Sequence, residues 1–335
     1  VLSLNNDFSV GADNALACIF SLSGLQITDA ERALFKTANP LGFILFKRNI
    51  DNPEQVSALV RDLKELVGRD CPILIDQEGG RVQRLRPPHW REYAPMKNFG
   101  DLFTSSPDEA LENLRFETLR LSEELTEIGV NVDCAPVLDV IFRGAHDIVG
   151  DRSFSEDPEI VSRLGLSVCR HFIRSGITPI IKHIPGHGRA KADSHLELPR
   201  VDAAYDNLMN IDFAPFRDIS KSDIGAHVWA MTAHIVFDNI DSKHPVSVSG
   251  GAIKDVIRGE IGFNGILIAD DLDMKALDHY GSASDKAMAS LNAGCDLALY
   301  CAGELPKMEE LARDLPPISQ ATIERLQKAA FHGNV

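Results

Sequence analysis

Apolar residues recur along the chain in short runs of strand length, separated by longer segments with helical spacing. A strand that is buried on both faces reads as a continuous apolar run instead of an alternating one. Runs of this kind predict eight buried strands, at positions 15–22, 41–46, 72–75, 131–136, 179–181, 229–234, 265–269 and 296–300. Their composition favours parallel strands that are covered by helices.

The connecting segments carry the signals of helices. Thr28 and Glu31 have the spacing of a capping box, which predicts a helix start just before residues 31–38. A proline near the start of 53–67 favours a second helix there. Further helices are predicted at 108–128, 158–174, around 213–216, and at 251–260, 284–292, 306–313 and 320–330.

Eight strands that alternate with helices predict an α/β protein built as a single TIM-type (β/α)₈ barrel. A doubly wound open sheet is the alternative fold, but no G-x-G-x-x-G motif follows the first strand, so dinucleotide binding is not favoured. No Ser/Gly-rich linker and no internal repeat divides the sequence. We therefore expect residues 1–335 to form one barrel with no second domain.

Composition and charge narrow the class of protein. Apolar residues at 44% and charged residues at 25% are ordinary for a soluble globular chain. A formal net charge of −15 opposes binding to nucleic acid or to an anionic membrane, because both need a basic surface. The six cysteines lie scattered, several inside apolar runs, which indicates free thiols in a reducing compartment. With no export signal and no membrane-spanning run, the cytoplasm is the expected location.

The densest polar segment, TPIIKHIPGHGRAKADSHLELP at 178–199, follows the fifth strand. Within it, Asp193 stands two residues before His195, so its carboxylate can accept one ring N–H and leave the other nitrogen free to move a proton. Taken alone, His183 or His187 is better explained as a buried or turn-capping residue, and an Asp/His pair also occurs by chance. Their gathering at one strand end predicts a functional site.

Other strands end in polar residues too. The active site of a (β/α)₈ barrel lies at the C-terminal ends of its strands. The candidates there are Asp76, Arg152, Lys182, His183, His234 and Asp270. Together they are rich in groups that hydrogen-bond to hydroxyls, and they include one group able to shuttle a proton and one spare carboxylate.

Four motifs make the sequence resemble a known family. KHIPGHG followed by ADSH, with DQEGGRVQR upstream and IADDLDM downstream, resembles the family 3 glycoside hydrolases over nearly the whole chain. The resemblance is greatest to the bacterial cytoplasmic β-N-acetylglucosaminidases of cell-wall recycling. It implies a retaining enzyme acting on a small carbohydrate, N-acetylglucosamine linked to anhydro-N-acetylmuramic acid with or without peptide. No cofactor or metal is expected, and a monomer is expected.

The resemblance also implies residue roles. Asp270 matches the catalytic nucleophile, His195 the general acid/base and Asp193 its partner. The residues that match those holding the N-acetylglucosamine ring are Asp76, Arg84, Arg152, Lys182 and His183. These roles agree with the chemistry, because cleavage of a glycosidic bond needs a carboxylate on one face of the anomeric carbon and a proton donor on the other. One departure is visible: Arg189-Ala190 stands where many members have Asp-Thr, so the loop tip is expected to differ.

Four other residues near these candidates can be explained by a structural role. Asp271 is expected to cap the turn after the strand or to pair with an arginine, and Glu78 is expected to pair with Arg81. Trp90 is expected to pack in its loop instead of forming a sugar platform. His234 is either a satisfied polar residue at the barrel rim or a substrate contact, and the sequence leaves both open.

Two other functions are alternatives. A metal-dependent hydrolase would take its ligands from His183, His187, His195 and Asp270, but Ser21-Leu22-Ser23 stands where such barrels carry H-x-H at the end of strand one. A non-catalytic barrel that only binds an amino sugar would be expected to lack Asp270 or His195, and both are present.

Overall fold

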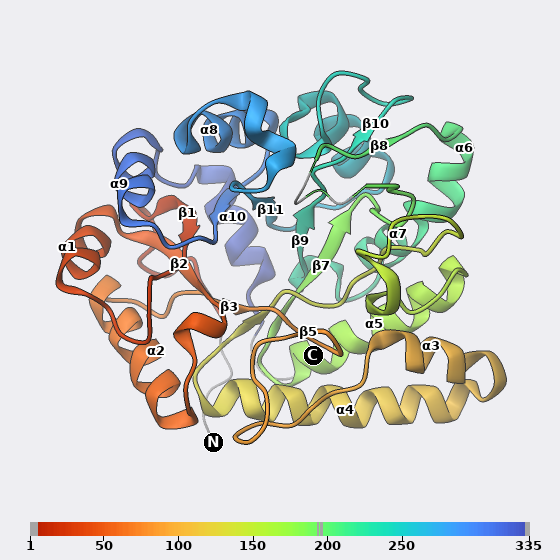
Figure 1. The fold of residues 1–335 in the computed structure, drawn as a ribbon, viewed down its shortest axis with the longest axis horizontal. Helices are drawn as coiled ribbons and strands as arrows, with labels where there is room; N and C mark the ends of the chain where they lie inside the picture. Colours follow the sequence, from red (N-terminus) through yellow and green to blue (C-terminus); the bar gives the residue numbers. More distant parts are fainter. Residues whose placement is uncertain (1–5, 193, 195–196, 332–335) are drawn as a thin grey trace.

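The computed structural model describes residues 6–192, 194 and 197–331, and within them eight strands pair into a closed parallel barrel (Figure 1). The strands are β1 (Leu16–Phe20), β2 (Pro40–Leu45), β3 (Ile73–Ile75), β6 (Val132–Asp133), β7 (Thr178–Ile184), β9 (Trp229–Thr232), β11 (Leu267–Asp271) and β12 (Leu297–Tyr300). Each pairs with the next in this order, and β12 closes the barrel on β1. The predicted (β/α)₈ barrel is confirmed, and the open sheet is excluded.

Helices cover the outside of the barrel and one of its ends. They are α1 (Asp29–Ala38), α2 (Pro53–Val67), α3 (Met96–Ser105), α4 (Pro107–Glu127), α5 (Pro158–Arg174), α6 (Tyr205–Asn207), α7 (Ala214–Ser220), α8 (Ala283–Ala293), α9 (Leu305–Asp314) and α10 (Gln320–Ala329). The capping box is present as predicted: Thr28 Oγ1 accepts from the N–H of Glu31, whose carboxylate accepts from the N–H of Thr28. None of the described helices combines the length and the apolar character that crossing a membrane requires.

Several short elements were not predicted. The chain has two small two-stranded sheets, β4 (Gln77–Gly79) with β5 (Val82–Gln83), and β8 (Arg200–Val201) with β10 (Val236–Phe237). Short 3₁₀ helices lie at Lys47–Asn49, Gly150–Arg152, Gly225–His227, Val246–Val248 and Lys275–Tyr280, and a short π-type segment lies at Leu208–Asp212. The helix predicted at 251–260 is present, as the π-type segment Ala252–Glu260. The elements that were not predicted are too short to show a hydrophobic period, which is the main signal of secondary structure in a sequence.

The inside of the barrel is a separate apolar cluster. It takes alternate residues from the strands, such as Ile19, Leu74, Ile180 and Ile268, whereas the residues between them pack against the helices. Alternation follows from the strand period of two, which sends successive side chains to opposite faces. The next inward positions on three strands are therefore Asp76, Lys182 and Asp270.

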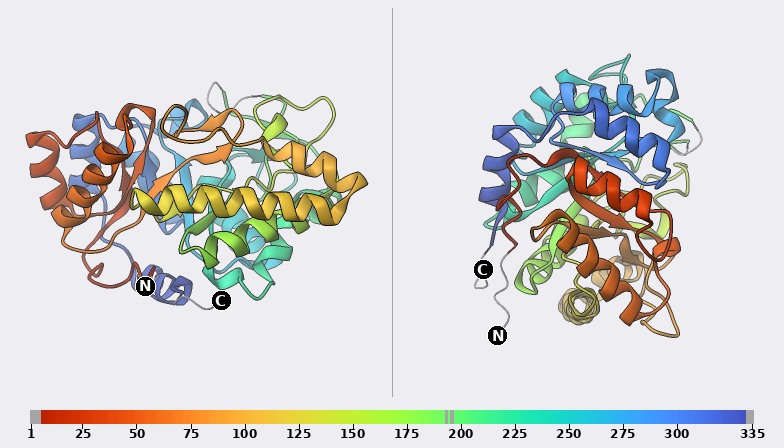
Figure 2. Two further views of the ribbon diagram at one scale, coloured as in Figure 1. Left: turned by 90° about the horizontal axis from the view of Figure 1, so that it is seen from below. Right: turned by 90° about the vertical axis from the view of Figure 1, so that its left-hand side faces the viewer.

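One end of this inner cluster is closed. Ile323 and Leu326 of α10 belong to the cluster, as does Phe8, whose ring meets the Trp229 ring edge to face at 5.6 Å. Figure 2 shows α10 at the end of the barrel opposite the β4–β5 hairpin. The other end, where the strands finish, is the one at which polar side chains collect.

Candidate active site

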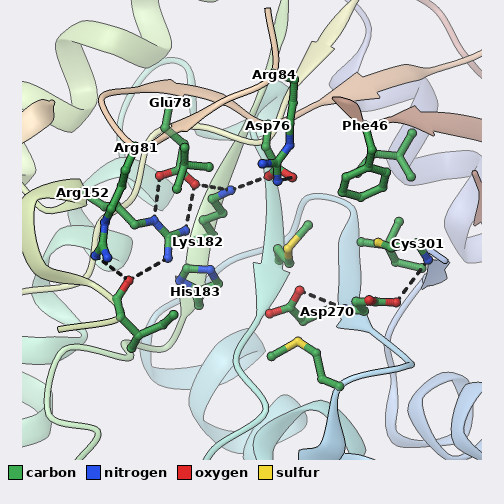
Figure 3. A pocket seen from close by; sticks show the side chains of 17 residues that line it. Phe46, Asp76, Glu78, Arg81, Arg84, Arg152, Lys182, His183, Asp270 and Cys301 are labelled. Carbon is green, nitrogen blue, oxygen red and sulfur yellow. Dashed lines mark hydrogen bonds and ion pairs between the residues drawn. The ribbon is translucent and has the colours of Figure 1, made fainter. Parts of the chain in front are cut away.

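A cavity of about 310 Å³ lies at the C-terminal ends of the strands (Figure 3). Its volume is at the lower end of the ~300–1,000 Å³ range of small-ligand pockets. All six predicted residues that the structure describes line it: Asp76, Arg84, Arg152, Lys182, His183 and Asp270. The other two predicted residues, Asp193 and His195, lie outside the described residues.

Lys182 and Asp76 form the centre of a buried ionic network. Lys182 Nζ donates to Asp76 Oδ1 at 2.8 Å, and Arg84 Nη2 donates to Asp76 Oδ2 at 2.9 Å. Burial opposes ionisation of Asp76, but the two cations outweigh it and lower the pKa of the carboxyl. Asp76 is therefore an ionised acceptor with lone pairs left for hydroxyl groups.

Glu78 is the second anion of this network and was not predicted as a site residue. It accepts two hydrogen bonds from Arg152, both at 2.8 Å, and its Oε1 lies 2.6 Å from Lys182 Nζ. Burial alone would raise the pKa of Glu78, but Arg152 and Lys182 have the larger effect and lower it to about 2. The expected Glu78–Arg81 pair is therefore wrong, because Arg152 offers a planar two-point partner in the same buried space.

Arg81 serves a neighbouring loop instead. Its Nε lies 2.9 Å from Asp151 Oδ1, and its Nη2 donates to the carbonyls of Asp147, Ile148 and Val149. These bonds tie the β4–β5 hairpin to the loop that precedes Arg152. The side chain thus helps to shape the cavity wall.

His183 faces the cavity from β7. The register between β7 and β9 shifts between Lys182 and Ile184, so a bulge interrupts the alternation of side chains there. His183 Nδ1 lies 2.7 Å from Asp139 Oδ2, and Asp139 Oδ1 accepts from the backbone N–H groups of His183 and His187. Burial raises the pKa of Asp139, but His183 outweighs this and brings it to about 2.

Asp139 was missed in the sequence, although a signal was present. Asp139 interrupts the otherwise apolar sequence PVLDV at 136–140. An aspartate in a buried segment is stable only when its carboxylate is hydrogen-bonded or ion-paired. The Asp139 carboxylate fixes one ring nitrogen of His183 and leaves the other available to the cavity.

Asp270 and Asp271 are adjacent but electrostatically different. Burial raises the pKa of Asp270, but His234 and His183 outweigh this, and the pKa is lowered overall. Burial raises the pKa of Asp271 to about 6. Asp271 Oδ1 accepts from the N–H groups of Asp273 and Cys301, which is the turn-capping position predicted for it. Asp270 is therefore the more acidic of two carboxylates that line the cavity.

His234 is a satisfied buried residue. Its Nε2 lies 3.1 Å from the carbonyl of Asp271, and its Nδ1 lies 2.7 Å from Ser247 Oγ. A carbonyl only accepts, so Nε2 carries the proton and Nδ1 accepts from the hydroxyl. Of the two alternatives for His234, the structure supports the rim residue, which holds the end of β11 in place.

The segment after β7 is anchored before residue 193 and again at residue 194. Gly188 packs so closely on Val140 that a Cβ there would lie 1.8 Å from its carbonyl oxygen. Ser194 is buried, its Oγ lies 3.3 Å from His187 Nε2, and its carbonyl accepts from the N–H of Ala276. Position 194 therefore lies beside the segment that follows Asp270.

The departure at Arg189 has a structural role. Arg189 Nε bonds to both carboxylate oxygens of Asp212, at 3.0 and 2.8 Å, and its guanidinium lies 3.6 Å from the centre of the Phe142 ring. Burial raises the pKa of Asp212 to about 6. The loop tip is thus anchored through the contacts of Arg189 with Asp212 and Phe142.

Two remaining expectations concern packing and metals. Trp90 is buried in the outer apolar cluster, so its predicted packing role is confirmed. Among residues 6–192, 194 and 197–331, no group of three or more His, Cys, Asp or Glu side chains is arranged to hold a metal ion.

Comparison with known proteins supplies the family. The model of the glycosyl hydrolase family 3 N terminal domain matches residues 13–330. A beta-hexosaminidase of Aromatoleum aromaticum is 34% identical over 314 residues, which cover 92% of this chain and 86% of that protein. One from Alkalilimnicola ehrlichii is 35% identical over 311 residues, covering 92% and 87%.

Solved structures agree with this match. NagZ from Neisseria gonorrhoeae, in complex with N-trifluoroacetyl-D-glucosamine, superposes with a TM-score of 0.86 at 31% identity, covering 94% of this chain and 90% of that one. A family 3 β-N-acetylglucosaminidase from Paenibacillus superposes with a TM-score of 0.81 at 28% identity, covering 96% of this chain and 60% of that one.

Proposed function

The chain belongs to glycosyl hydrolase family 3, and from this membership we propose that it is a retaining exo-β-N-acetylglucosaminidase. The chain matches beta-hexosaminidases over most of its own length and over most of theirs, so the general activity is β-N-acetylhexosaminidase. The proposed substrate is terminal β-linked N-acetylglucosamine on anhydro-N-acetylmuramic acid, with or without peptide. We further propose that one barrel, acting as a cytoplasmic monomer without cofactor, performs this step of cell-wall recycling.

The observation that carries the proposal is the Asp270 carboxylate, which lies across the cavity from a ring of hydrogen-bonding groups (Figure 3). Lys182 has three N–H donors, of which Asp76 and Glu78 take two. Arg152 has five, of which Glu78 takes two and the Ile148 carbonyl one. The remaining donors and the free lone pairs of Asp76 suit the several hydroxyls of one sugar ring.

In the first step, an Asp270 oxygen attacks the anomeric carbon as the bond to the leaving oxygen breaks. Protonated His195 would give its proton to that oxygen. Before this transfer, Asp193 would stabilise the positive charge of the His195 imidazolium. In the second step, His195 would remove a proton from water, which displaces Asp270. Two displacements at one carbon return the original β configuration.

The proposal for His195 is supported by the position of its neighbour. Ser194 contacts His187 and the backbone of Ala276, six residues after Asp270. An imidazole also suits both directions of proton transfer, since its ordinary pKa is about 6.5. A second carboxylate, which most glycosidases use, would require a raised pKa to act as the acid.

Labelling tests the nucleophile directly. A 5-fluoro glycosyl fluoride of N-acetylglucosamine should leave a sugar on the peptide 265–275, attached at Asp270. Asp271→Asn should still be labelled and Asp270→Asn should not. An α-anomer as the first product, or full activity in Asp270→Ala, would overturn the mechanism.

The acid/base role is tested by leaving groups. His195→Ala should lose little rate in the first step with an acidic phenol, which departs without a proton, and should show a burst of phenol because the second step stays slow. Equal losses with good and poor leaving groups would remove His195 from this role. Asp193→Ala should add little to His195→Ala if the two act as one unit.

A substrate panel tests the specificity. The aryl β-N-acetylglucosaminide should be hydrolysed more efficiently than the aryl β-glucoside or β-xyloside. Faster turnover of the glucoside would contradict the assignment. Activity that is lost on chelation would instead favour the metal-dependent alternative.

A further inference from the structure

His187 is a buried histidine in the loop after β7 that the proposed mechanism does not use. It is 5% exposed. Its backbone N–H donates to Asp139 Oδ1 at 2.7 Å, and its carbonyl accepts from the N–H of Ala190 at 3.1 Å. The next residue, Gly188, has no room for a side chain. The backbone is therefore fixed at this point, which limits where the His187 ring can point.

The ring of His187 lies between the sugar cavity and Ser194. It meets the ring of His183 edge to face, with the two ring centres 5.7 Å apart. His183 itself lines the cavity (Figure 3). The Nε2 atom of His187 lies 3.3 Å from Ser194 Oγ. His187 thus connects the wall of the cavity to residue 194.

The contact with Ser194 explains why a polar ring is buried here. Within the described residues it is the one side-chain hydrogen bond of His187, and Nδ1 is buried without a partner. A buried polar nitrogen without a partner costs free energy, so an apolar side chain of similar volume would fill this space with less loss. The bond to Ser194 is therefore what a histidine contributes at this position and an apolar residue would not.

The His187 ring is neutral at pH 7. Burial and the neighbouring His183 lower its pKa to about 4, although Asp139 and Asp270 act in the opposite direction. A neutral ring can hold Ser194 without adding a positive charge next to the proposed acid, which must itself carry a proton.

Ser194 is held from a second direction as well. It is 3% exposed, and its carbonyl accepts from the N–H of Ala276 at 3.3 Å. Residue 194 is therefore fixed between His187 and the segment that follows the proposed nucleophile. Consecutive α-carbons are about 3.8 Å apart, so this restricts the positions open to the two neighbours in the sequence, Asp193 and His195.

We propose that His187 is a positioning residue for proton transfer, which acts through Ser194 on the proposed acid/base His195. The inference rests on the proposed function, in which His195 protonates the leaving oxygen. His187 is not among the residues that line the sugar cavity. Its loss should therefore affect the steps that need a proton and leave the binding of the sugar ring unchanged.

The test compares two aryl β-N-acetylglucosaminides, one whose acidic phenol leaves without a proton and one whose weakly acidic phenol needs a proton. His187→Leu removes the hydrogen bond and keeps a side chain of similar bulk. Its kcat/KM, which reports the first step, should fall about tenfold with the weakly acidic phenol and less than twofold with the acidic one. The tenfold loss is part of the about 10²–10⁴-fold that a well-placed general acid contributes.

Two further variants remove or restore the same bond. Ser194→Ala should give the same dependence on the leaving group, and combining it with His187→Leu should add little, because both changes break one contact. His187→Gln should recover part of the loss, since its amide offers both a donor and an acceptor. If His187→Leu does not fold, Ser194→Ala decides alone, because it deletes a single oxygen atom.

Ser162→Ala is the matched control, because Ser162 is a buried serine on α5 whose hydroxyl donates one hydrogen bond, to Asp218, away from the cavity. It should leave both kcat/KM values within twofold of the parent. Equal losses with the two phenols in His187→Leu and Ser194→Ala, or losses no larger than in the control, would overturn the inference while the proposed function stands. If His195→Ala shows no dependence on the leaving group, the proposed acid and the inference fall together.

Discussion

Replacement of Glu78 by glutamine is the most informative single change outside the proposed catalytic residues. Glu78 is 2% exposed and makes contacts of 2.6–2.8 Å with Lys182 and Arg152. Glutamine keeps the shape but removes the charge. The network of Asp76, Glu78, Arg84, Arg152 and Lys182 would change from a net charge of about +1 to about +2 in a buried space.

The loss in stability can be worked out in two ways. The pKa of Glu78 is lowered from 4.5 to about 2, which corresponds to about 3 kcal/mol at about 1.4 kcal/mol for each pKa unit. Breaking a buried ion pair by removing one partner costs about 3–5 kcal/mol. A lowered carboxyl pKa stabilises the fold above pH 4.5, and this contribution disappears as the pH falls towards 2.

We therefore expect Glu78→Gln to lose about 3 kcal/mol in free energy of unfolding at pH 7, measured by urea denaturation. The difference from the parent should shrink as the pH falls below about 4.5. Lys182 and Arg152, which are proposed to donate to the sugar, would then be less well held. We therefore expect kcat/KM on the aryl β-N-acetylglucosaminide to fall about 10- to 100-fold, mainly through KM. Glu156→Gln, which removes the exposed partner of Arg143, should change stability by less than about 0.5 kcal/mol.

Two results would refute this reasoning. Unchanged stability would mean that Glu78 does not balance the buried cations. Lower stability with an unchanged KM would mean that Arg152 and Lys182 keep their positions without Glu78. Glu78→Asp separates charge from reach, because it restores the anion but cannot span both partners at the same distances.

Three further predictions follow from other buried carboxylates. Between pH 4 and 6 the free energy of unfolding of Asp271→Asn should shift by about 2 kcal/mol in the variant's favour relative to the parent, because burial raises the Asp271 pKa from 3.8 to about 6; a difference between variant and parent that stays constant from pH 4 to 8 would contradict this. Asp296→Ala should cost about 3–5 kcal/mol in urea denaturation without changing kcat, because Asp296 bonds to Arg258 and Arg325 away from the cavity. Asp139→Asn should raise KM about tenfold by releasing the His183 ring, and an unchanged KM would show that the ring is held otherwise.

The sequence predicted the strands well because a two-faced buried strand has a strong apolar signal. The predicted run at 179–181 is observed as β7 (Thr178–Ile184), and 265–269 as β11 (Leu267–Asp271). Both strands continue through the charged residues that were expected to follow them. The reason is that the upper part of the barrel interior is a cavity, so an inward charge does not end the strand.

The site was predicted where side chains follow a strand directly, and it was missed where partners come from different loops. Asp76, Lys182 and Asp270 are fixed by strand parity. Glu78 pairs with Arg152, which is 74 residues away in the sequence, and not with the nearby Arg81. Spacing in the sequence does not predict this ion-pair partner, because the partner is the guanidinium that can reach the buried carboxylate with two hydrogen bonds.

The closure of β12 on β1 also has a consequence for synthesis of the chain. About 280 residues separate the two paired strands. At roughly 5–20 residues per second, a ribosome needs roughly 15–55 s to make that length. Throughout this interval one edge of β1 has no partner strand, and unpaired edges are where chains join one another wrongly. Until its last strand emerges, the nascent barrel therefore has an edge that is open to pairing with another chain.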